Sequence, residues 1–434
     1  MPIRLDTQSS AFPEAFAAFL ASKRESAPDV AATVADIIAA VRARGDAALV
    51  ELSLTYDRVD LTGRIKVEEH EIDAALAQVP AETLEALEFA KARIEAHHAR
   101  QLPRDERYVD PVGVELGQRW TPVDAVGLYV PGGTAAYPSS VLMNAVPAKV
   151  AGVPRIAMVV PSPDGLIAPL VLAAARLAGV NEVYRVGGAQ AVAALAYGTA
   201  TIAPVDKIVG PGNAYVAAAK RQVFGQVGID MIAGPSEVLI LADGNANPAW
   251  IAADLLAQAE HDAAAQSILV TESAALADAV ERAVEAQLST LPRKDIAAAS
   301  WRDHGAIILV RAIDEAPALI DRVAPEHLEI HCEDADRLAA RIRHAGAIFI
   351  GPYTPEAIGD YVGGTNHVLP TARSARFSSG LGVYDFMKRT SILKCSAESL
   401  RAIGTAAVRL ATVERLEAHG RSILIRTNAG QPDA

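Results

Sequence analysis

The stretch Val126-Gly127-Leu128-Tyr129-Val130, followed by Pro131-Gly132-Gly133, decides the fold class. It is a short apolar run that ends at a turn signal, the pattern of a strand buried on both faces of a sheet. Similar runs follow at 156–160, 182–186, 207–209 and 238–241, separated by Ala- and Leu-rich patterns with helical spacing. Because helices that join parallel strands cover both faces of the sheet, this alternation predicts an α/β domain.

A second alternation of the same kind begins at Pro248. A helical pattern over about 248–266 precedes an apolar run at 268–271. Another helical pattern, over 277–287, precedes runs at 307–310 and 348–350. No clean sequence repeat relates the two alternations. The predicted fold class is therefore α/β, with two Rossmann-like parallel-sheet domains.

Both ends of the chain are predicted to be mainly helical. Apolar residues from Val30 to Val41 recur with helical spacing after Pro28-Asp29, and another such pattern covers 81–99. The residues beyond Gly380 also have helical patterns. The expected division is an N-terminal helical extension (1–25), a first α/β domain (26–128 with 236–380), a second Rossmann-like domain (129–235) and a C-terminal helical extension (381–434).

The composition is that of a globular protein of several domains. The chain has 434 residues, of which 51% are hydrophobic and 21% are charged. Its formal net charge of -12 argues against binding to nucleic acid, whose phosphates repel an acidic surface. Residues 1–6 lack the apolar core of a secretory signal, and the apolar stretch 166–175 is too short to span a membrane. These features predict a cytoplasmic protein without a membrane or nucleic-acid partner.

Two glycine-rich turns are candidates for binding the phosphates of a nucleotide. They are Val186-Gly187-Gly188-Ala189-Gln190 and Val209-Gly210-Pro211-Gly212-Asn213. Each places glycines at the start of a predicted helix, where free backbone N–H groups and the helix dipole favour an anion. Neither has the full dinucleotide fingerprint. Spacing alone therefore favours tight strand-to-helix turns over a nucleotide site.

The helical segment Gln258-Ala259-Glu260-His261 is a weak candidate for a metal site. Gln258 and His261 share one helix face, and His, unlike Gln, is a common zinc ligand. Asp360 and His419 could complete a nitrogen and oxygen set, but no spacing links positions so far apart. The alternative is a solvated helix face that carries one His and one Gln.

Glu326-His327, after Ala324-Pro325, are candidates for proton transfer. An acid and an imidazole on a predicted loop suit this chemistry because His titrates near neutral pH. The alternative, a helix N-cap region with a helix-favouring Glu, fits the pattern equally well. Cys332 and Cys395 lack a motif that would activate a thiolate, so catalysis by a nucleophilic cysteine is not expected.

Taken together, the motifs are far more specific than each one alone. In order along nearly the whole chain, they resemble the conserved stretches of the histidinol dehydrogenase family. The matching stretches are 126–149, 187–191, 207–216, 230–237, 256–262, 324–329, 359–367 and 414–420.

The resemblance implies a function and a set of site residues. The implied reaction is the four-electron oxidation of L-histidinol to L-histidine through bound L-histidinaldehyde, with two NAD, as the last step of histidine biosynthesis. One Zn2+ per subunit would be held by Gln258, His261, Asp360 and His419. Glu326 and His327 would be catalytic; Tyr129, Gln190 and Asn213 would contact NAD; Ser236, His327, His367, Glu414 and the zinc ligands would contact the substrate.

The resemblance also implies a homodimer with shared active sites. In it, the C-terminal segment carries Glu414 and His419 into the site of the neighbouring subunit. Some family members have cysteines where this chain has Leu116 and Val153. Their absence argues against a thiohemiacetal intermediate and for a water-dependent second oxidation through Glu326 and His327. Two rival functions are a generic zinc alcohol or aldehyde dehydrogenase and a non-catalytic zinc-binding protein.

Overall fold

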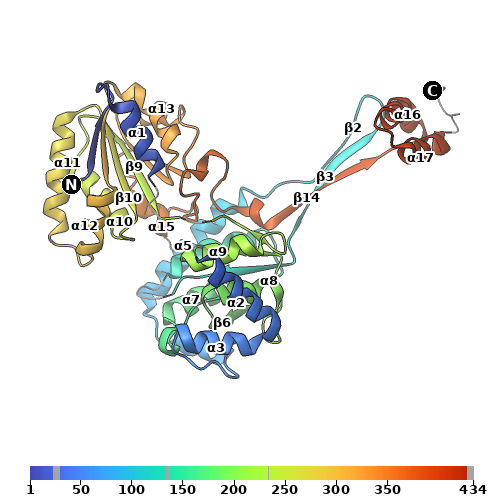
Figure 1. Cartoon of the computed structure of the whole chain (residues 1–434), viewed down its shortest axis with the longest axis horizontal. Helices are drawn as coiled ribbons and strands as arrows, with labels where there is room; N and C mark the ends of the chain where they lie inside the picture. The colour runs from blue at the N-terminus through green and yellow to red at the C-terminus, as the bar shows by residue number, and fades with distance from the viewer. Residues whose placement is uncertain (23–29, 133–136, 233, 428–434) are drawn as a thin grey trace.

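The computed structural model describes residues 1–22, 30–132, 137–232 and 234–427, so Pro28, Asp29 and Gly133 lie outside the described residues. Two parallel sheets, each covered by helices, form two bodies, and a long three-stranded arm leaves them (Figure 1). This arrangement confirms the predicted α/β class with two parallel sheets. No helix among the described residues is long and apolar enough to cross a membrane. The cytoplasmic location stays a prediction.

The smaller parallel sheet contains the stretch that decided the fold class. Its strand order is β6-β5-β4-β7-β8, with β4 at the centre and every residue of β4 buried. Along the chain, β5 and then β6 are added on one side of β4. The chain then crosses to the other side of β4, where β7 and β8 are added. The strands are β4 (Ala125–Tyr129), β5 (Arg155–Val159), β6 (Glu182–Tyr184), β7 (Lys207–Val209) and β8 (Gly228–Ile229).

Helices from before and within this alternation cover both faces of the five-stranded sheet. One face packs against α4 (Glu69–Leu76), α5 (Ala81–Ala99), α6 (Pro138–Val150) and α7 (Pro169–Ala178). The other face packs against α2 (Ala31–Arg44), α3 (Asp46–Tyr56), α8 (Gly188–Tyr197) and α9 (Ala214–Val223).

This packing corrects the expected grouping of 26–128 with 236–380. Val34 and Leu49 share a core with Val192, and Leu87 and Ile94 share a core with Leu142. The helices before β4 therefore belong with the five-stranded sheet. Helical spacing shows that a helix has an apolar face, but it does not show which sheet that face will cover.

The larger parallel sheet has the order β1-β11-β10-β9-β12-β13. One face packs against α1 (Phe12–Ala21), α13 (Ala316–Val323) and α14 (Ala335–Ala339). The other packs against α10 (Pro248–Ala259), α11 (Ala274–Leu288) and α12 (Lys294–His304). The strands are β1 (Ile3–Asp6), β9 (Glu237–Ala242), β10 (Gln266–Thr271), β11 (Ala306–Leu309), β12 (His327–His331) and β13 (Ala347–Ile350).

The N-terminus is part of this sheet and is not a separate helical extension. Residues 3–6 form the edge strand β1, which pairs in parallel with β11. Phe12 and Phe16 of α1 join the core beneath the sheet. An edge strand of four residues with one fully buried side chain has no apolar run to reveal it in the sequence.

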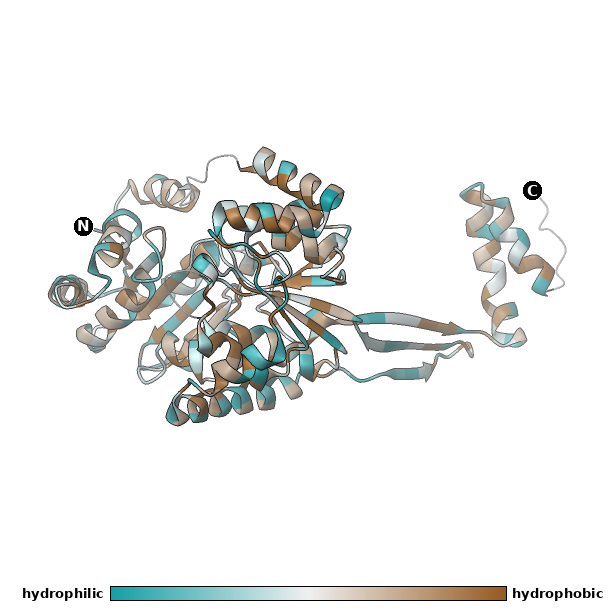
Figure 2. Cartoon of the chain, turned by 90° about the horizontal axis from the view of Figure 1, so that it is seen from below, coloured by the Kyte–Doolittle hydropathy of each residue, from teal (hydrophilic) through white to brown (hydrophobic). Residues whose placement is uncertain are grey.

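The arm and the helical pair at its end form the C-terminal part of the chain. Strand β14 (Met387–Lys394) pairs antiparallel with β3 (Glu115–Pro122), which pairs with β2 (Glu106–Val109). The C-terminal extension thus begins with a strand before its helices α16 (Ala397–Val413) and α17 (Glu417–Thr427). Figures 1 and 2 show, from two directions, that this helical pair stands apart from both bodies.

Candidate active site

His327 and Glu326 lie at the amino end of β12, between β9 and the edge strand β13 of the larger sheet. His327 is the first residue of the strand and pairs with Val238 of β9. Both side chains are almost completely buried, 5% and 6% exposed. The structure therefore places His327 in a strand, where the sequence pattern predicted a loop or a helix cap.

The ring of His327 has a defined tautomer. Its Nδ1 lies 3.0 Å from the carbonyl oxygen of Glu237, which only accepts hydrogen bonds, so Nδ1 carries the proton and donates. Its Nε2 is buried and has no hydrogen-bond partner among the described residues. Burial, helped by His261 and His367, lowers the pKa of His327 to about 3. The imidazole is therefore neutral at pH 7, with a lone pair on Nε2.

Glu326 is held by the same residue that orients His327. Its Oε2 accepts a hydrogen bond from the backbone N–H of Glu237 at 2.9 Å. The same oxygen lies 3.8 Å from Nδ1 of His327. A backbone N–H donor favours the anionic form of a carboxyl group, which is the form that can accept a proton.

Gln258 and His261 meet beside these two residues. Gln258 lies in the last turn of α10, and His261 follows in the turn after the helix, which ends earlier than predicted. The amide oxygen of Gln258 accepts from Nδ1 of His261 at 3.0 Å, and its nitrogen donates to Oε1 of Glu356 and to the Glu237 carbonyl, each at 3.2 Å. Because Gln258 is completely buried, the alternative of a solvated face is wrong for this residue.

The helix α15 (Glu356–Tyr361) brings two carboxylates to the same place. Ligand atoms of His327, Glu356 and Asp360 all lie within 4.8 Å of one another. Burial raises the pKa of Asp360 to about 6, although His261 opposes the shift. Burial, followed by repulsion from Asp360, raises the pKa of Glu356 well above its usual value. His367 joins the group by donating from Nδ1 to the Asp360 carbonyl at 3.0 Å.

This group fits a cation. Oε2 of Glu356, like Nε2 of His327, is buried without a hydrogen-bond partner among the described residues. Buried carboxylates without cationic partners are costly, and a metal ion would compensate them. Sequence reasoning missed Glu356; its position one helical turn before Asp360 is the signal that could have revealed it.

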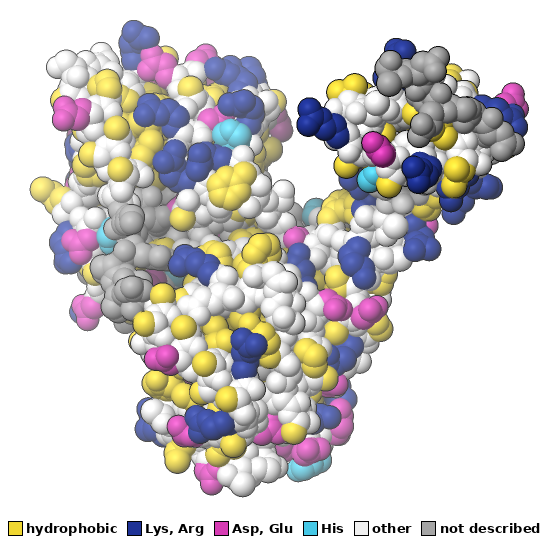
Figure 3. Space-filling model, turned by 45° about the vertical axis from the view of Figure 1, so that its right-hand side comes forward, with side chains coloured by type: hydrophobic (Ala, Val, Ile, Leu, Met, Phe, Trp, Pro, Cys, Tyr) yellow, Lys and Arg dark blue, Asp and Glu magenta, His cyan; other side chains and the backbone are white. Residues whose placement is uncertain are grey.

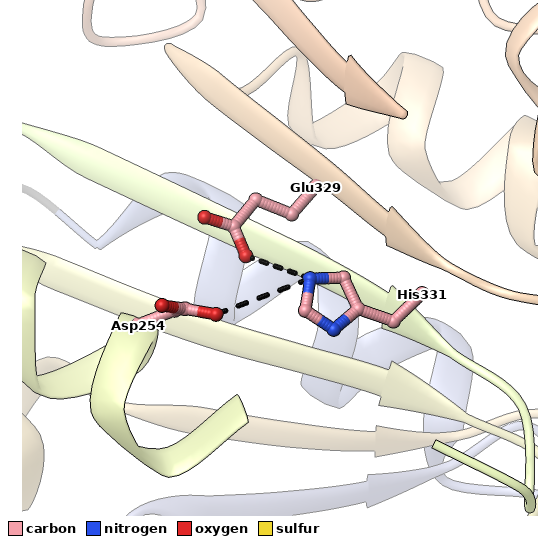
Figure 4. A group of neighbouring side chains, drawn as sticks. All are labelled: Asp254, Glu329 and His331. Carbon is pink, nitrogen blue, oxygen red and sulfur yellow. Dashed lines mark hydrogen bonds and ion pairs between the residues drawn. The ribbon is translucent and has the colours of Figure 1, made fainter. Parts of the chain in front are cut away.

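A second group, Asp254, Glu329 and His331, lies farther along the same strand and helix (Figure 4). Nε2 of His331 lies 3.1 Å from Oε2 of Glu329 and 3.9 Å from Oδ2 of Asp254. The other oxygen of Glu329 accepts from the backbone N–H of Glu356 at 2.6 Å. Because both oxygens of Glu329 already accept hydrogen bonds, this group fits a cation less well than the first.

Glu414 and His419 do not join the site within one chain. Glu414 follows the end of α16, and His419 lies in α17, on the helical pair that stands apart from both bodies (Figure 1). Ser236 does lie near the site, directly before Glu237, and its carbonyl accepts from the Gln266 N–H at 3.0 Å.

The three residues expected to contact NAD lie at one edge of the smaller sheet. Tyr129 ends β4, Gln190 lies in the first turn of α8, and Asn213 caps α9 by accepting from the N–H groups of Tyr215 and Val216. The hydroxyl of Tyr129 accepts from the Gly188 N–H at 3.0 Å. This edge contains the carboxyl ends of β4 and β7, where the chain reverses its order across the sheet, the usual ligand crevice of such folds.

The candidate metal-binding group lies close to the junction of the two bodies. Nδ2 of Asn366, in the loop after α15, donates to the carbonyl of Met143 in α6 at 2.7 Å. His367 of the site is the next residue along the chain. The candidate metal and proton-transfer site thus lies beside the body built on the smaller sheet. That body also carries the residues expected to contact NAD.

Comparison with known proteins decides the family. A sequence model described as histidinol dehydrogenase matches residues 20–427. The chain belongs to the histidinol dehydrogenase family. It is 67% identical to the histidinol dehydrogenase of Bradyrhizobium diazoefficiens over 99% of this chain and 100% of that one. It is 68% identical to that of Nitrobacter winogradskyi over 99% and 100%.

A solved structure supports the same assignment. The crystal structure of histidinol dehydrogenase from Elizabethkingia anophelis matches with a TM-score of 0.95 and 36% identity, covering 98% of each chain. The activity of the histidinol dehydrogenase family is the four-electron oxidation of L-histidinol to L-histidine. The chain is thus an oxidoreductase of histidine biosynthesis.

Proposed function

We propose that this chain oxidises L-histidinol in two steps, with His327 as the base in both and Glu326 as the group that activates water. The observation that carries the proposal is the tautomer of His327. Its Nδ1 proton is held by the Glu237 carbonyl at 3.0 Å, and its buried Nε2 is without a hydrogen-bond partner among the described residues. A neutral imidazole in this state can accept a proton from a substrate hydroxyl.

In the first oxidation, the substrate hydroxyl gives its proton to Nε2 of His327. Bound NAD would accept a hydride from the carbon in each of the two oxidations. The product of the first is the aldehyde. Water then adds to it: Glu326 would take a proton from the water, and protonated His327 would give its proton to the carbonyl oxygen, so that a gem-diol forms and His327 is neutral again. In the second oxidation, a gem-diol hydroxyl gives its proton to His327, and the carboxylic acid forms. The two oxidations thus remove four electrons and take up one oxygen atom from water.

Glu326 is placed to activate that water. Its carboxylate accepts the Glu237 N–H at 2.9 Å, which favours the anion, while His327 next to it passes between neutral and protonated forms. Cys332 does not offer an alternative nucleophile. Burial, with a contribution from Asp243, raises the pKa of its thiol to about 12, so it stays protonated at neutral pH.

The metal in this proposal is Zn2+, held by Gln258, His261 and Asp360 of one chain and by the partner subunit's His419. The buried Oε2 of Glu356, which has no hydrogen-bond partner among the described residues, supports a cation beside Asp360. When bound, zinc would hold the amine and imidazole of the substrate and so fix its orientation. His367 and Ser236, beside the group, would complete the substrate contacts, together with the partner subunit's Glu414.

The place of the C-terminal helical pair supports a homodimer with shared sites. The arm and the pair expose large apolar side chains, among them Leu393 at 67%, Leu410 at 63% and Val413 at 77% (Figure 3). A helical pair that projects alone would leave this surface in water, and a second copy of the chain would cover it. The same contact would bring His419 to the other copy's site.

The test is to incubate the purified protein with L-histidinol and NAD and to count the NADH formed per histidinol consumed. Two NADH per substrate supports the proposal. One indicates a simple alcohol dehydrogenase, and none indicates a binding protein. A parallel assay with L-histidinaldehyde isolates the second oxidation, and ion-exchange chromatography of the product identifies histidine.

A further inference from the structure

We propose that Glu329, His331 and Asp254, here called the positioning triad, fix the helices that carry the metal ligands. The inference rests on the proposed metal site and extends it to residues that do not touch the metal or the substrate.

The first link joins β12 to α15. Oε1 of Glu329 accepts from the backbone N–H of Glu356 at 2.6 Å. Glu356 is the first residue of α15, whose first N–H groups have no acceptor within the helix. Glu329 is completely buried, so its carboxylate has no water to replace this partner. The bond fixes the start of a helix that carries Asp360 one turn later.

The second link joins β12 to α10. Oε2 of Glu329 accepts from Nε2 of His331 at 3.1 Å, and this nitrogen lies 3.9 Å from Oδ2 of Asp254. Figure 4 shows that both carboxylates face the same nitrogen of the imidazole. Asp254 lies in α10, one turn before Gln258. The triad therefore connects the helix that carries Gln258 with the helix that carries Asp360.

Strand β12, which the triad joins to α10 and α15, also carries His327, the proposed base. Side chains alternate along a strand, so His327, Glu329 and His331 of β12 point to the same face of the sheet. On β12, Glu329 is two positions from His327, and on α10, Asp254 is one helical turn from Gln258. The expected role of the triad is to hold His327, Gln258 and Asp360 in register before the metal binds.

Loss of Glu329 would release α15 from the sheet. The Glu356 N–H would lose its acceptor, and His331 and Asp254 would lose the carboxylate that joins them to α15. Supporting hydrogen bonds around metal ligands are worth about 10–100-fold in metal affinity. Glu329→Ala is therefore expected to weaken zinc binding by about that factor, with little change in NAD affinity.

The experiment compares three variants of the full-length protein: Glu329→Ala, Glu329→Gln and Glu333→Gln. Glutamine keeps an oxygen that can accept from the Glu356 N–H, so it should restore part of the affinity. Glu333 is an exposed residue just beyond β12, and its variant is the matched control. Zinc affinity is measured on the metal-stripped proteins by competition with a chromophoric chelator. Circular dichroism checks the fold.

A second readout does not depend on zinc. Amide hydrogen exchange of the metal-free proteins should show faster exchange in α15 for Glu329→Ala than for the parent or Glu333→Gln. Unchanged exchange in α15, or unchanged zinc affinity, would overturn the proposal. So would a second zinc per chain that Glu329→Ala removes, because the triad would then be a ligand set. If the parent protein bound no zinc, the proposed metal site would fail, and the exchange data would still decide the role of Glu329 in positioning α15.

Discussion

The Glu237 carbonyl accepts from Nδ1 of His327 at 3.0 Å, while the N–H of the same residue donates to Oε2 of Glu326 at 2.9 Å. One residue of β9 thus orients both members of the proposed acid–base pair through its backbone. Both contacts are made by backbone atoms, so they do not depend on which side chain stands at position 237. They fix the tautomer of the imidazole and favour the anionic carboxylate, the two states that the proposed reaction needs.

His327→Ala should abolish both oxidations. The variant removes the group proposed to accept the substrate's hydroxyl proton in both oxidations, and general-base catalysis contributes about 10²–10⁴-fold to rate. Steady-state NADH formation with L-histidinol and with L-histidinaldehyde measures the two steps. His70→Ala, a change at an exposed histidine of α4, is the control and should leave both rates unchanged. Retention of either oxidation in His327→Ala would contradict the common role.

Glu326→Gln should separate the two oxidations. The amide oxygen can still accept from the Glu237 N–H, so the geometry is preserved, but the anionic base is lost. Alcohol oxidation and aldehyde reduction should be spared more than aldehyde oxidation, and the NADH formed per histidinol should fall from two toward one. Equal loss of all three activities would show that Glu326 does not act on water alone.

Most strands of both parallel sheets could be predicted from sequence, whereas the arm, the edge strands β1 and β8, and the site strand β12 could not. β4 and β9 are buried at every residue and appear as apolar runs. By contrast, every residue of β2 is exposed, and β1 has one fully buried residue. Exposed strands have no hydrophobic pattern that distinguishes them from loops, so the sequence predicted a mainly helical C-terminal extension and did not reveal β14.

The site depends on sheet order, which local spacing does not encode. β12 lies next to β9, so Glu237 and Glu326 meet although 89 positions separate them. Gln258 and Glu356 meet because α10 and α15 pack against each other. Local spacing therefore gave only weak candidates, and the resemblance to a family supplied the ligand set. It did not supply Glu356, which the structure places against His327 at 3.5 Å.

Asn213 should have two separable roles. Its side chain caps α9, and loss of such a cap costs about 1 kcal/mol. Asn213→Ala should therefore lower the free energy of unfolding and also raise the KM for NAD. Asn213→Ser keeps a capping oxygen and should restore stability, but not NAD affinity. If serine restored both, the residue would be a helix cap without a cofactor contact. Urea denaturation and NAD kinetics provide the two measurements.

The buried ion pair between Lys220 and Asp230 should dominate the stability of the turn that presents Asn213. Lys220 also donates to the Gly210 carbonyl at 3.0 Å, and Asp230 accepts from the Gly210 N–H at 2.7 Å. Lys220→Met leaves a buried charge unpaired and should cost about 3–5 kcal/mol of unfolding free energy.

Two further variants test this reasoning about charge. Adding Asp230→Asn to Lys220→Met should recover part of the loss, because it removes the unpaired charge and keeps an acceptor for Gly210. The control is Arg311→Met, which breaks the exposed pair with Glu315 and should cost about 0–1 kcal/mol. A double variant less stable than Lys220→Met would contradict the charge argument.

Shared active sites can be tested by mixing two inactive variants. In a dimer of His419→Ala with His327→Ala, one site would combine an intact body with an intact C-terminal helical pair from the other chain. Random mixing should therefore restore about a quarter of the parent activity, because half of the dimers are mixed and each has one complete site. Mixing His327→Ala with His261→Ala should restore none, since both changes damage the body. Failure of the first mixture to recover activity would show that His419 does not act across the dimer.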